Sequence, residues 1–453
     1  MGQIHFSRAL LAAGWRSDVL ITLEGRTIAG IDVGVPAPAS AERIAGVAAP
    51  GMANVHSHAF QRAMAGLTER HGLEDDSFWT WREVMYRFLA HMTPDDIESV
   101  AAMAYVEMLE AGFTTVGEFH YLHHAPDGAR YADPAETAGR IVAAAATSGI
   151  GLTLLPCFYA HGGCGGKPAN PGQARFLSDL DGFASLVEAS RGHAASLEGA
   201  TLGIAPHSLR AVDAPELHAL AKSFGSGPIH IHAAEQALEV EECLAWSGAR
   251  PVQWLLDNLD VDERWCLIHC THMTQEEIDG LARSGAVAGL CPITESNLGD
   301  GVFAAADFER AGGRFAIGTD SNVRIAVNEE LRTLEYSQRL RDQKRNRLGA
   351  PGASTGRSIF DAARNGGAQA LALGPSGLSV GQAADIVVLD DAHPSLACRT
   401  DDAALDAWIF ATGEVVCEVL GGGRRVVTGG RHVRREEVRR RYAATMRRLL
   451  DQA

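Results

Sequence analysis

The chain has 453 residues, of which 46% are hydrophobic and 21% charged, a composition typical of a folded globular protein rather than a disordered or fibrous one. Lysine and arginine number 40 against 56 acidic residues, and the net charge of -16 argues against a nucleic-acid or anionic-membrane binder. The eight cysteines are sparse and include no C-x-x-C pair. We find no secretory signature, and no apolar stretch approaches the roughly 20 residues of a membrane span. These features predict a reduced, cytoplasmic protein.

Both ends of the chain have the alternating, turn-punctuated pattern of short β-strands. In residues 1–48 we expect strands over 17–23 and 27–33, and in residues 377–430 we expect strands over 384–389, 407–411, 414–420 and 424–428. Because the segment between these two β-rich ends has a different pattern, we expect both ends to form one small composite β-sandwich domain. The arginine-rich residues 431–453 predict a solvated C-terminal helix that packs on the rest of the protein.

Residues 49–376 alternate short apolar runs with amphipathic stretches such as 94–111, 135–147 and 275–283. Eight apolar runs cover residues 52–56, 114–119, 151–159, 202–207, 228–232, 266–270, 286–292 and 315–320. Eight strand–helix units predict an α/β fold, a (β/α)8 barrel, with an open doubly wound sheet as the alternative. Metal-binding residue types at the ends of at least five runs favour the barrel, because barrel enzymes place their chemistry at the carboxyl ends of the strands.

Four of the predicted strands end in side chains that commonly bind metal ions. His56 and His58 end the first strand, and residues two apart on a strand face the same side. His232 ends the fifth strand, His269 the sixth and Asp320 the eighth. Imidazoles and a carboxylate form a suitable donor set for Zn²⁺ or Fe²⁺, so we expect a metal site at the mouth of the barrel.

Along the chain, the motifs occur in a fixed order: P-G-M-x-N-x-H-x-H, then H-x-x-E, then a single strand-end histidine, then T-D-S. In this order of its motifs the sequence resembles the amidohydrolase superfamily over about residues 18–430. This resemblance implies a barrel hydrolase that uses a metal-bound hydroxide, and a homodimer. Binuclear members carry a carboxylated lysine on the fourth strand, but the three lysines of this chain all lie outside residues 202–207. One divalent ion, Zn²⁺ with Fe²⁺ as the alternative, is therefore expected on His56, His58, His232 and Asp320. A binuclear amide or ester hydrolase is the alternative that the missing lysine disfavours.

The same residues suggest a hydrolytic mechanism. A bound metal lowers the pKa of its water toward ~7, which gives hydroxide near neutral pH. Asp320 and His269 are placed to accept and hold the water proton while hydroxide attacks an sp² carbon. Glu235, three residues after His232, is the candidate general acid for the departing nitrogen, and the alternative role is to orient His232. The strand-end position of His269 fits a further metal ligand equally well.

More specific blocks resemble the formimidoylglutamate deiminase family. They are H-S-H-A-F-Q-R at 56–62, T-W-R at 80–82, G-E-F-H-Y at 117–121, A-P-H-S-L-R at 205–210, H-A-A-E-Q at 232–236 and the stretch 329–348. The resemblance implies hydrolysis of N-formimino-L-glutamate to N-formyl-L-glutamate and ammonia in histidine degradation. It also implies five substrate-binding side chains: Gln61, Arg82, Tyr121, His207 and Arg210.

Two arginines suit a small-molecule substrate with two carboxylates. Other roles are open for three members of this set, since Arg82 could stack on a tryptophan, Arg210 could pair with Asp213, and Tyr121 could close the barrel mouth. A deaminase of aminopurines, pterins or other heterocycles is the alternative activity, although such a site would favour ring stacking and neutral amides over two arginines. A non-catalytic scaffold on the same fold is a third possibility, and the complete set of ligand positions argues against it.

Overall fold

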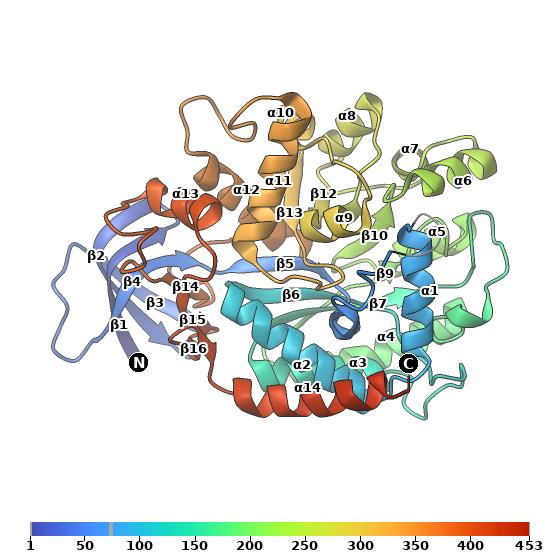
Figure 1. Ribbon diagram of the computed structural model, residues 1–453, viewed down its shortest axis with the longest axis horizontal. Coiled ribbons are helices and arrows are strands. Elements are labelled where there is room, and N and C mark those ends of the chain that lie inside the picture. Colours follow the sequence, from blue (N-terminus) through green and yellow to red (C-terminus); the bar gives the residue numbers. More distant parts are fainter. Residues whose placement is uncertain (1, 72–75, 453) are drawn as a thin grey trace.

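A computed structural model describes residues 2–71 and 76–452 (Figure 1). Parallel strands form a barrel in the middle of the chain. They are β5 (Met52–Ser57), β6 (Phe113–His120), β7 (Gly151–Phe158), the broken pair β8 (Thr201–Leu202) and β9 (Ala205–Pro206), β10 (Ile229–Ala233), β11 (Trp265–His269), β12 (Val287–Leu290) and β13 (Arg314–Ile317). Strands β5 to β8 pair in sequence order, as do β10 to β13. Single parallel bridges at Ile204–Ile229 and Ser57–Asp320 join the two sheets. The predicted (β/α)8 barrel is confirmed, and the open-sheet alternative is wrong.

Helices follow the barrel strands, and most of them cover the outer side of the barrel. They are α1 (Phe78–Leu89), α2 (Pro94–Ala111), α3 (Glu136–Ser148), α4 (Leu180–Ala195), α5 (Ala214–Ser223), α6 (Ala237–Ser247), α7 (Pro251–Asn258), α8 (Gln275–Ser284), α9 (Pro292–Leu298), α10 (Ala305–Arg310), α11 (Val327–Asp342) and α12 (Thr355–Ala370). Helix α2 matches its predicted range because both ends are encoded locally. Thr93 and Asp96 form a capping box at its start, and Gly112 ends it with a left-handed φ of 98°.

The two ends of the chain share one sheet, at the left of Figure 1. Its strands are β1 (Gly2–Leu11), β2 (Gly14–Glu24), β3 (Thr27–Val33), β4 (Glu42–Pro50), β14 (Ile386–Leu389), β15 (Val416–Gly421), β16 (Arg424–Thr428) and β17 (Arg431–His432). The order is β17-β16-β15-β14-β4-β1-β2-β3, and β14 pairs antiparallel with β4. Phe6, Val19 and Val388 belong to a separate apolar cluster under this sheet. The prediction of a small β-rich part built from both termini is confirmed.

Two predicted elements differ from the structure. Residues 407–411 are not a strand but the end of α13 (Asp402–Ala411), which buries Leu405, Trp408 and Ile409 at helical spacing. A short apolar run fits either element until its neighbours in space are known. The C-terminal helix α14 (Arg435–Leu450) begins later than expected, because Gly429-Gly430 reverses the chain so that β17 pairs with β16. Helix α14 packs along α2, where Arg441 pairs with Glu98 at 2.9 Å.

Among the residues described, none of the helices has the length and apolar character that a membrane crossing requires.

Candidate active site

The four expected metal ligands lie together at the carboxyl ends of β5, β10 and β13. His56 Nε2 is 3.2 Å from His232 Nε2, and Asp320 Oδ1 is 3.4 Å from the Nε2 atoms of both His56 and His58. All four side chains are buried. Closure of the barrel creates this proximity, because the backbone of Asp320 donates to His56 O at 2.9 Å and accepts from His58 N at 2.9 Å.

The hydrogen bonds of the histidines orient their free ring nitrogens toward the cluster. Nδ1 of His58 lies 2.8 Å from Phe119 O, and Nδ1 of His232 lies 2.9 Å from His207 O. A carbonyl only accepts, so each Nδ1 carries the proton and each Nε2 presents a lone pair. Burial, followed by the neighbouring His58, lowers the pKa of His56 to about 3, which keeps this imidazole neutral.

Asp320 completes a donor set that suits a divalent cation. Burial would raise the pKa of Asp320, but its hydrogen bond with His56 and its position beside His58 and the protonated His269 lower this pKa below its usual range, so the carboxylate is ionised. Neutral imidazole lone pairs and an ionised carboxylate then face a common point at short distance. Such a buried group of acceptors is stabilised by a positive ion, and nitrogen and oxygen donors of this kind are typical of zinc sites.

His269 and Glu235 lie beside the cluster and face each other. His269 Nε2 is 3.6 Å from Glu235 Oε1 and 3.9 Å from Asp320 Oδ2, while its Nδ1 is 3.3 Å from Glu295 Oε1. Burial lowers the pKa of His269, but Glu235, Glu295 and Asp320 outweigh it and raise this pKa to about 10. Burial also raises the pKa of Glu235. A protonated imidazole and a carboxyl group with a raised pKa therefore lie side by side at the edge of the candidate metal site.

Glu295, in α9, is a residue of this site that the sequence did not reveal. Its carboxylate also accepts a hydrogen bond from Cys291 N at 2.8 Å, which fixes the acid at the start of the helix. None of the motif blocks quoted above contains Glu295. It reaches His269 only in the assembled barrel.

A cavity of about 130 Å³ brings the five expected substrate-binding residues to the same place. Its lining also includes His58, His232, Glu235, His269 and Asp320. Aromatic side chains form much of the remaining wall: Phe78, Trp79, Trp81, Tyr86, Tyr121, Tyr159 and Phe176. Apart from His56, the sequence-predicted metal-binding, catalytic and substrate-binding residues thus line one cavity.

The two arginines of this cavity differ in their contacts. The Arg82 guanidinium lies 4.5 Å from the ring centre of Trp79, so the stacking on a tryptophan that the sequence left open as an alternative role occurs. Arg210 pairs with Glu235 at 3.2 Å, whereas Asp213 caps α5 by accepting from Glu216 N. Within the part of the chain that the structure describes, the buried Nε atoms of both Arg82 and Arg210 have no hydrogen-bond partner. Each arginine therefore retains a donor for an anionic group.

The neutral members of the set, Gln61, Tyr121 and His207, also line this cavity. Gln61 Nε2 donates to the Tyr121 hydroxyl at 2.9 Å, and the buried Gln61 Oε1 has no partner among the described residues. His207 lies next to His232, with 4.7 Å between their ring centres, and its Nδ1 is 3.0 Å from Ser208 Oγ. These groups offer polar contacts that complement the two arginines.

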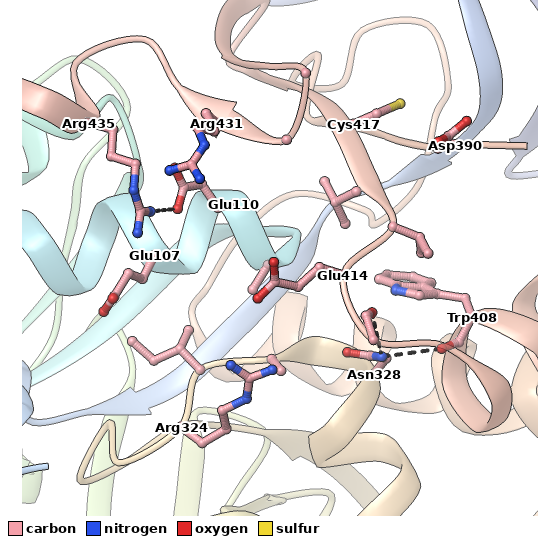
Figure 2. A pocket seen from close by; sticks show the side chains of 18 of the residues that line it. Glu107, Glu110, Arg324, Asn328, Asp390, Trp408, Glu414, Cys417, Arg431 and Arg435 are labelled. Atoms are coloured by element: carbon pink, nitrogen blue, oxygen red, sulfur yellow. Dashed lines mark hydrogen bonds and ion pairs between the residues drawn. The ribbon is translucent and has the colours of Figure 1, made fainter. Parts of the chain in front are cut away.

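A larger cavity of about 630 Å³ lies elsewhere, between α2, the start of α11 and the strands β15 to β17 (Figure 2). Its charged side chains are largely paired, Arg62 with Glu107 at 2.6 Å and Arg435 with Glu110. Among its described lining residues there is none of the predicted metal, catalytic or substrate-binding groups. The smaller cavity is therefore the candidate active site, despite its size.

The barrel and the His–Asp cluster define a metal-dependent hydrolase, and comparison with known proteins agrees. The chain belongs to the amidohydrolase family, whose model matches residues 47–425. It is 50% identical to the formimidoylglutamate deiminase of Pseudomonas aeruginosa over 457 aligned residues, which cover 100% of both proteins. It is 27% identical to a 5-methylthioadenosine/S-adenosylhomocysteine deaminase of Natronomonas pharaonis, over 85% of this chain and 82% of that protein.

Solved structures give the same result. An amidohydrolase from Brucella melitensis superposes with a TM-score of 0.96 at 53% identity, covering 99% of this chain and 100% of that one. A zinc-bound adenosine deaminase from Xanthomonas campestris shares the fold, with a TM-score of 0.81 at 20% identity, over 99% of this chain and 98% of that one. The family resemblances predicted from the sequence motifs are confirmed.

Proposed function

We propose that this protein hydrolyses N-formimino-L-glutamate to N-formyl-L-glutamate and ammonia, a step of histidine degradation. The observation that carries the proposal is the meeting, in one small cavity, of the His–Asp cluster with two arginines whose buried Nε–H groups face no partner among the described residues. The 50% identity with a formimidoylglutamate deiminase over the whole chain supports it.

The metal of the proposed reaction is one divalent ion, Zn²⁺ in preference to Fe²⁺, on His56, His58, His232 and Asp320. This set is supported by the 3.2 Å between the Nε2 atoms of His56 and His232 and by the 3.4 Å from Asp320 Oδ1 to Nε2 of both His56 and His58. When bound, such an ion supplies Lewis acidity that brings the pKa of a coordinated water near 7. The protein contributes the fixed orientation of each imidazole through the carbonyl oxygens of Phe119 and His207.

The side chains around the cluster move the protons. As water adds to the formimino carbon, Asp320 takes up the proton that the water loses, while His269, which its raised pKa of about 10 keeps protonated, stabilises the negative charge beside Asp320. Glu235, whose pKa burial raises, gives a proton to the terminal nitrogen as water adds. Asp320 then passes the water proton to the same nitrogen, the C–N bond breaks and ammonia leaves, while the hydroxyl of the tetrahedral intermediate returns its proton to Glu235 as the formyl C=O forms.

Arg82 and Arg210 bind the two carboxylates of the substrate, and Gln61, Tyr121 and His207 supply further polar contacts. Charged hydrogen bonds to guanidinium groups in a buried site are strong and geometrically specific. The heterocycle deaminase alternative is favoured by the aromatic walls of the cavity. However, the Arg82 guanidinium covers Trp79 at 4.5 Å, and this places a cation where a ring would stack.

We also propose that the protein works in the cytoplasm as a homodimer, as its family resemblance implies. Light scattering coupled to gel filtration measures the mass of the particle and so tests the dimer. A monomer mass across the micromolar range would contradict it.

The test of the proposed activity is ammonia release by the zinc-loaded protein from N-formimino-L-glutamate, compared with guanine, adenosine and cytosine. We expect release from the formimino compound alone, with kcat/KM above ~10⁴ M⁻¹s⁻¹. Release only from a heterocycle would preserve the hydrolytic chemistry and refute the assignment of the two arginines to substrate carboxylates.

A further inference from the structure

The turn between β10 and α6 is held in an uncommon conformation by one buried carboxylate. Ala234 in this turn has a left-handed φ of 51°, which a residue with a side chain adopts only when its surroundings stabilise it. Glu239, in the first turn of α6, accepts hydrogen bonds from two consecutive backbone groups, Ala234 N at 3.2 Å and Glu235 N at 3.0 Å. Its side chain is buried, with 1% exposure.

The same carboxylate lies next to the arginine of the active site. Arg210 Nη2 is 4.0 Å from Glu239 Oε2 and 3.2 Å from Glu235 Oε2. A buried guanidinium needs a negative partner to offset its desolvation. When Glu235 carries a proton as the general acid, Glu239 is the remaining carboxylate within 4.0 Å of Arg210 among the described residues.

We propose that Glu239 is a positioning residue for the reaction, one that fixes the acid Glu235 and the substrate-binding Arg210 relative to each other. This inference rests on the proposed function. Glu239 acts on Glu235 through the backbone of the turn and on Arg210 through charge. It touches neither the substrate nor the reacting atoms.

A carboxylate is suited to this role in a way that its amide analogue is not. Oε1 of Glu239 accepts from Ala234 N, and Oε2 accepts from Glu235 N. Glutamine has one acceptor oxygen, so its NH₂ group would face one of these two N–H donors. Glu239→Gln therefore disturbs the turn and removes the charge without changing the size of the side chain. Glu239→Asp keeps both acceptors on a shorter stem.

The experiment compares Glu239→Gln and Glu239→Asp with Glu241→Gln, an exposed position on the same helix. For each zinc-loaded variant we would measure kcat and KM with N-formimino-L-glutamate, inhibition by N-formyl-L-glutamate, bound zinc and thermal unfolding. For Glu239→Gln we expect kcat to fall about tenfold or more, with a smaller change in KM and full zinc content. Glu239→Asp should recover part of kcat, and Glu241→Gln should match the wild type.

A merely structural role gives a different result. Glu239→Gln would then unfold at a lower temperature while its kcat, measured well below that temperature, stayed equal to that of Glu241→Gln, and this would overturn the inference. If the wild type releases no ammonia from N-formimino-L-glutamate, it is the proposed function that fails. A crystal structure of Glu239→Gln then decides the inference separately, because an unmoved Glu235 still bonded to Arg210 would contradict it.

Discussion

Arg210 donates a hydrogen bond to Glu235, with 3.2 Å between Nη2 and Oε2, and both side chains are buried. The residue proposed to bind a substrate carboxylate is therefore in contact with the residue proposed to protonate the departing nitrogen. A carboxylate that approaches Arg210 competes with Glu235 for the guanidinium charge. Recognition of the substrate and delivery of the proton are thus linked through one contact.

Replacement of Arg210 by alanine tests recognition. We expect kcat/KM for N-formimino-L-glutamate to fall by the equivalent of about 2 to 4 kcal/mol, because one substrate carboxylate loses its charged donor in a buried site. Zinc content should stay that of the wild type, since Arg210 contacts none of the four proposed ligands. Steady-state kinetics and metal analysis measure both effects. A metal-free variant, or one with unchanged kinetics, would remove Arg210 from the substrate-binding set.

Replacement of Glu235 by glutamine tests proton transfer. The amide cannot give up a proton as an acid, so turnover should be lost while the cavity keeps its shape. Calorimetric titration with N-formyl-L-glutamate should show binding within a few-fold of the wild type. An enzyme that retains full activity with Glu235→Gln would discard the general-acid role.

Removal of the metal should destabilise the folded protein. Without a cation, the lone pairs of His56, His58 and His232 and the charge of Asp320 face one another in a buried site. A ligand present at a thousand times its Kd stabilises a fold by about 4 kcal/mol, so chelation should lower the unfolding temperature and added zinc should restore it. Differential scanning fluorimetry measures the shift.

A matched pair of variants tests which histidines bind the zinc. His58→Ala should lose stoichiometric zinc. His161→Ala should keep it, because His161 belongs to a separate group with Asp213 and Glu216 outside the candidate site. Equal zinc content in the two variants would refute the proposed ligand set.

Stability toward acid should depend on His123, a buried histidine outside the proposed site. Burial, opposed by its bond to Cys157 O, lowers the pKa of His123 from 6.5 to about 4. Between pH 6.5 and 4 the unfolded chain binds a proton at this position and the folded protein does not. The stabilising contribution is thus complete above pH 6.5 and lost as the pH falls toward 4, with a slope of up to about 1.4 kcal/mol per pH unit.

Urea unfolding at pH 7, 6 and 5 measures this contribution. His123→Gln keeps a donor for Cys157 O and removes the titrating ring, so its unfolding free energy should fall less steeply with decreasing pH than that of the wild type. Equal slopes for the two proteins would show that the imidazole of His123 does not contribute.

Much of the barrel is predictable because its signals are local. Buried parallel strands read as short apolar runs, and the predicted run at 52–56 differs from β5 by one residue. The metal-binding residue types mark where these strands end, so closure of the barrel is sufficient to bring His56, His232 and Asp320 together. Strand β1 was not predicted, although Ile4 and Phe6 alternate with polar residues, because one alternation near a terminus is a weak signal.

The contacts that orient the catalytic groups are not predictable in this way. Glu295 reaches His269, and Arg210 reaches Glu235 instead of Asp213, through the packing of loops after different strands. These pairings depend on side-chain directions that only the assembled barrel determines. The sequence therefore predicts which residue types lie at the mouth of the barrel, but their hydrogen-bond and ion-pair partners are determined by the tertiary structure.

The pairing of β4 with β14 has a consequence for synthesis of the chain. Pro50 at the end of β4 pairs with Ile386, and β5, which carries His56, begins immediately after β4 at Met52. While the ribosome makes the barrel, β4 has an open edge that can pair with other chains, since its partner emerges only after the last barrel helix. Messages or fusions that stall translation before residue 386 should therefore yield aggregates, even when the barrel segment is complete.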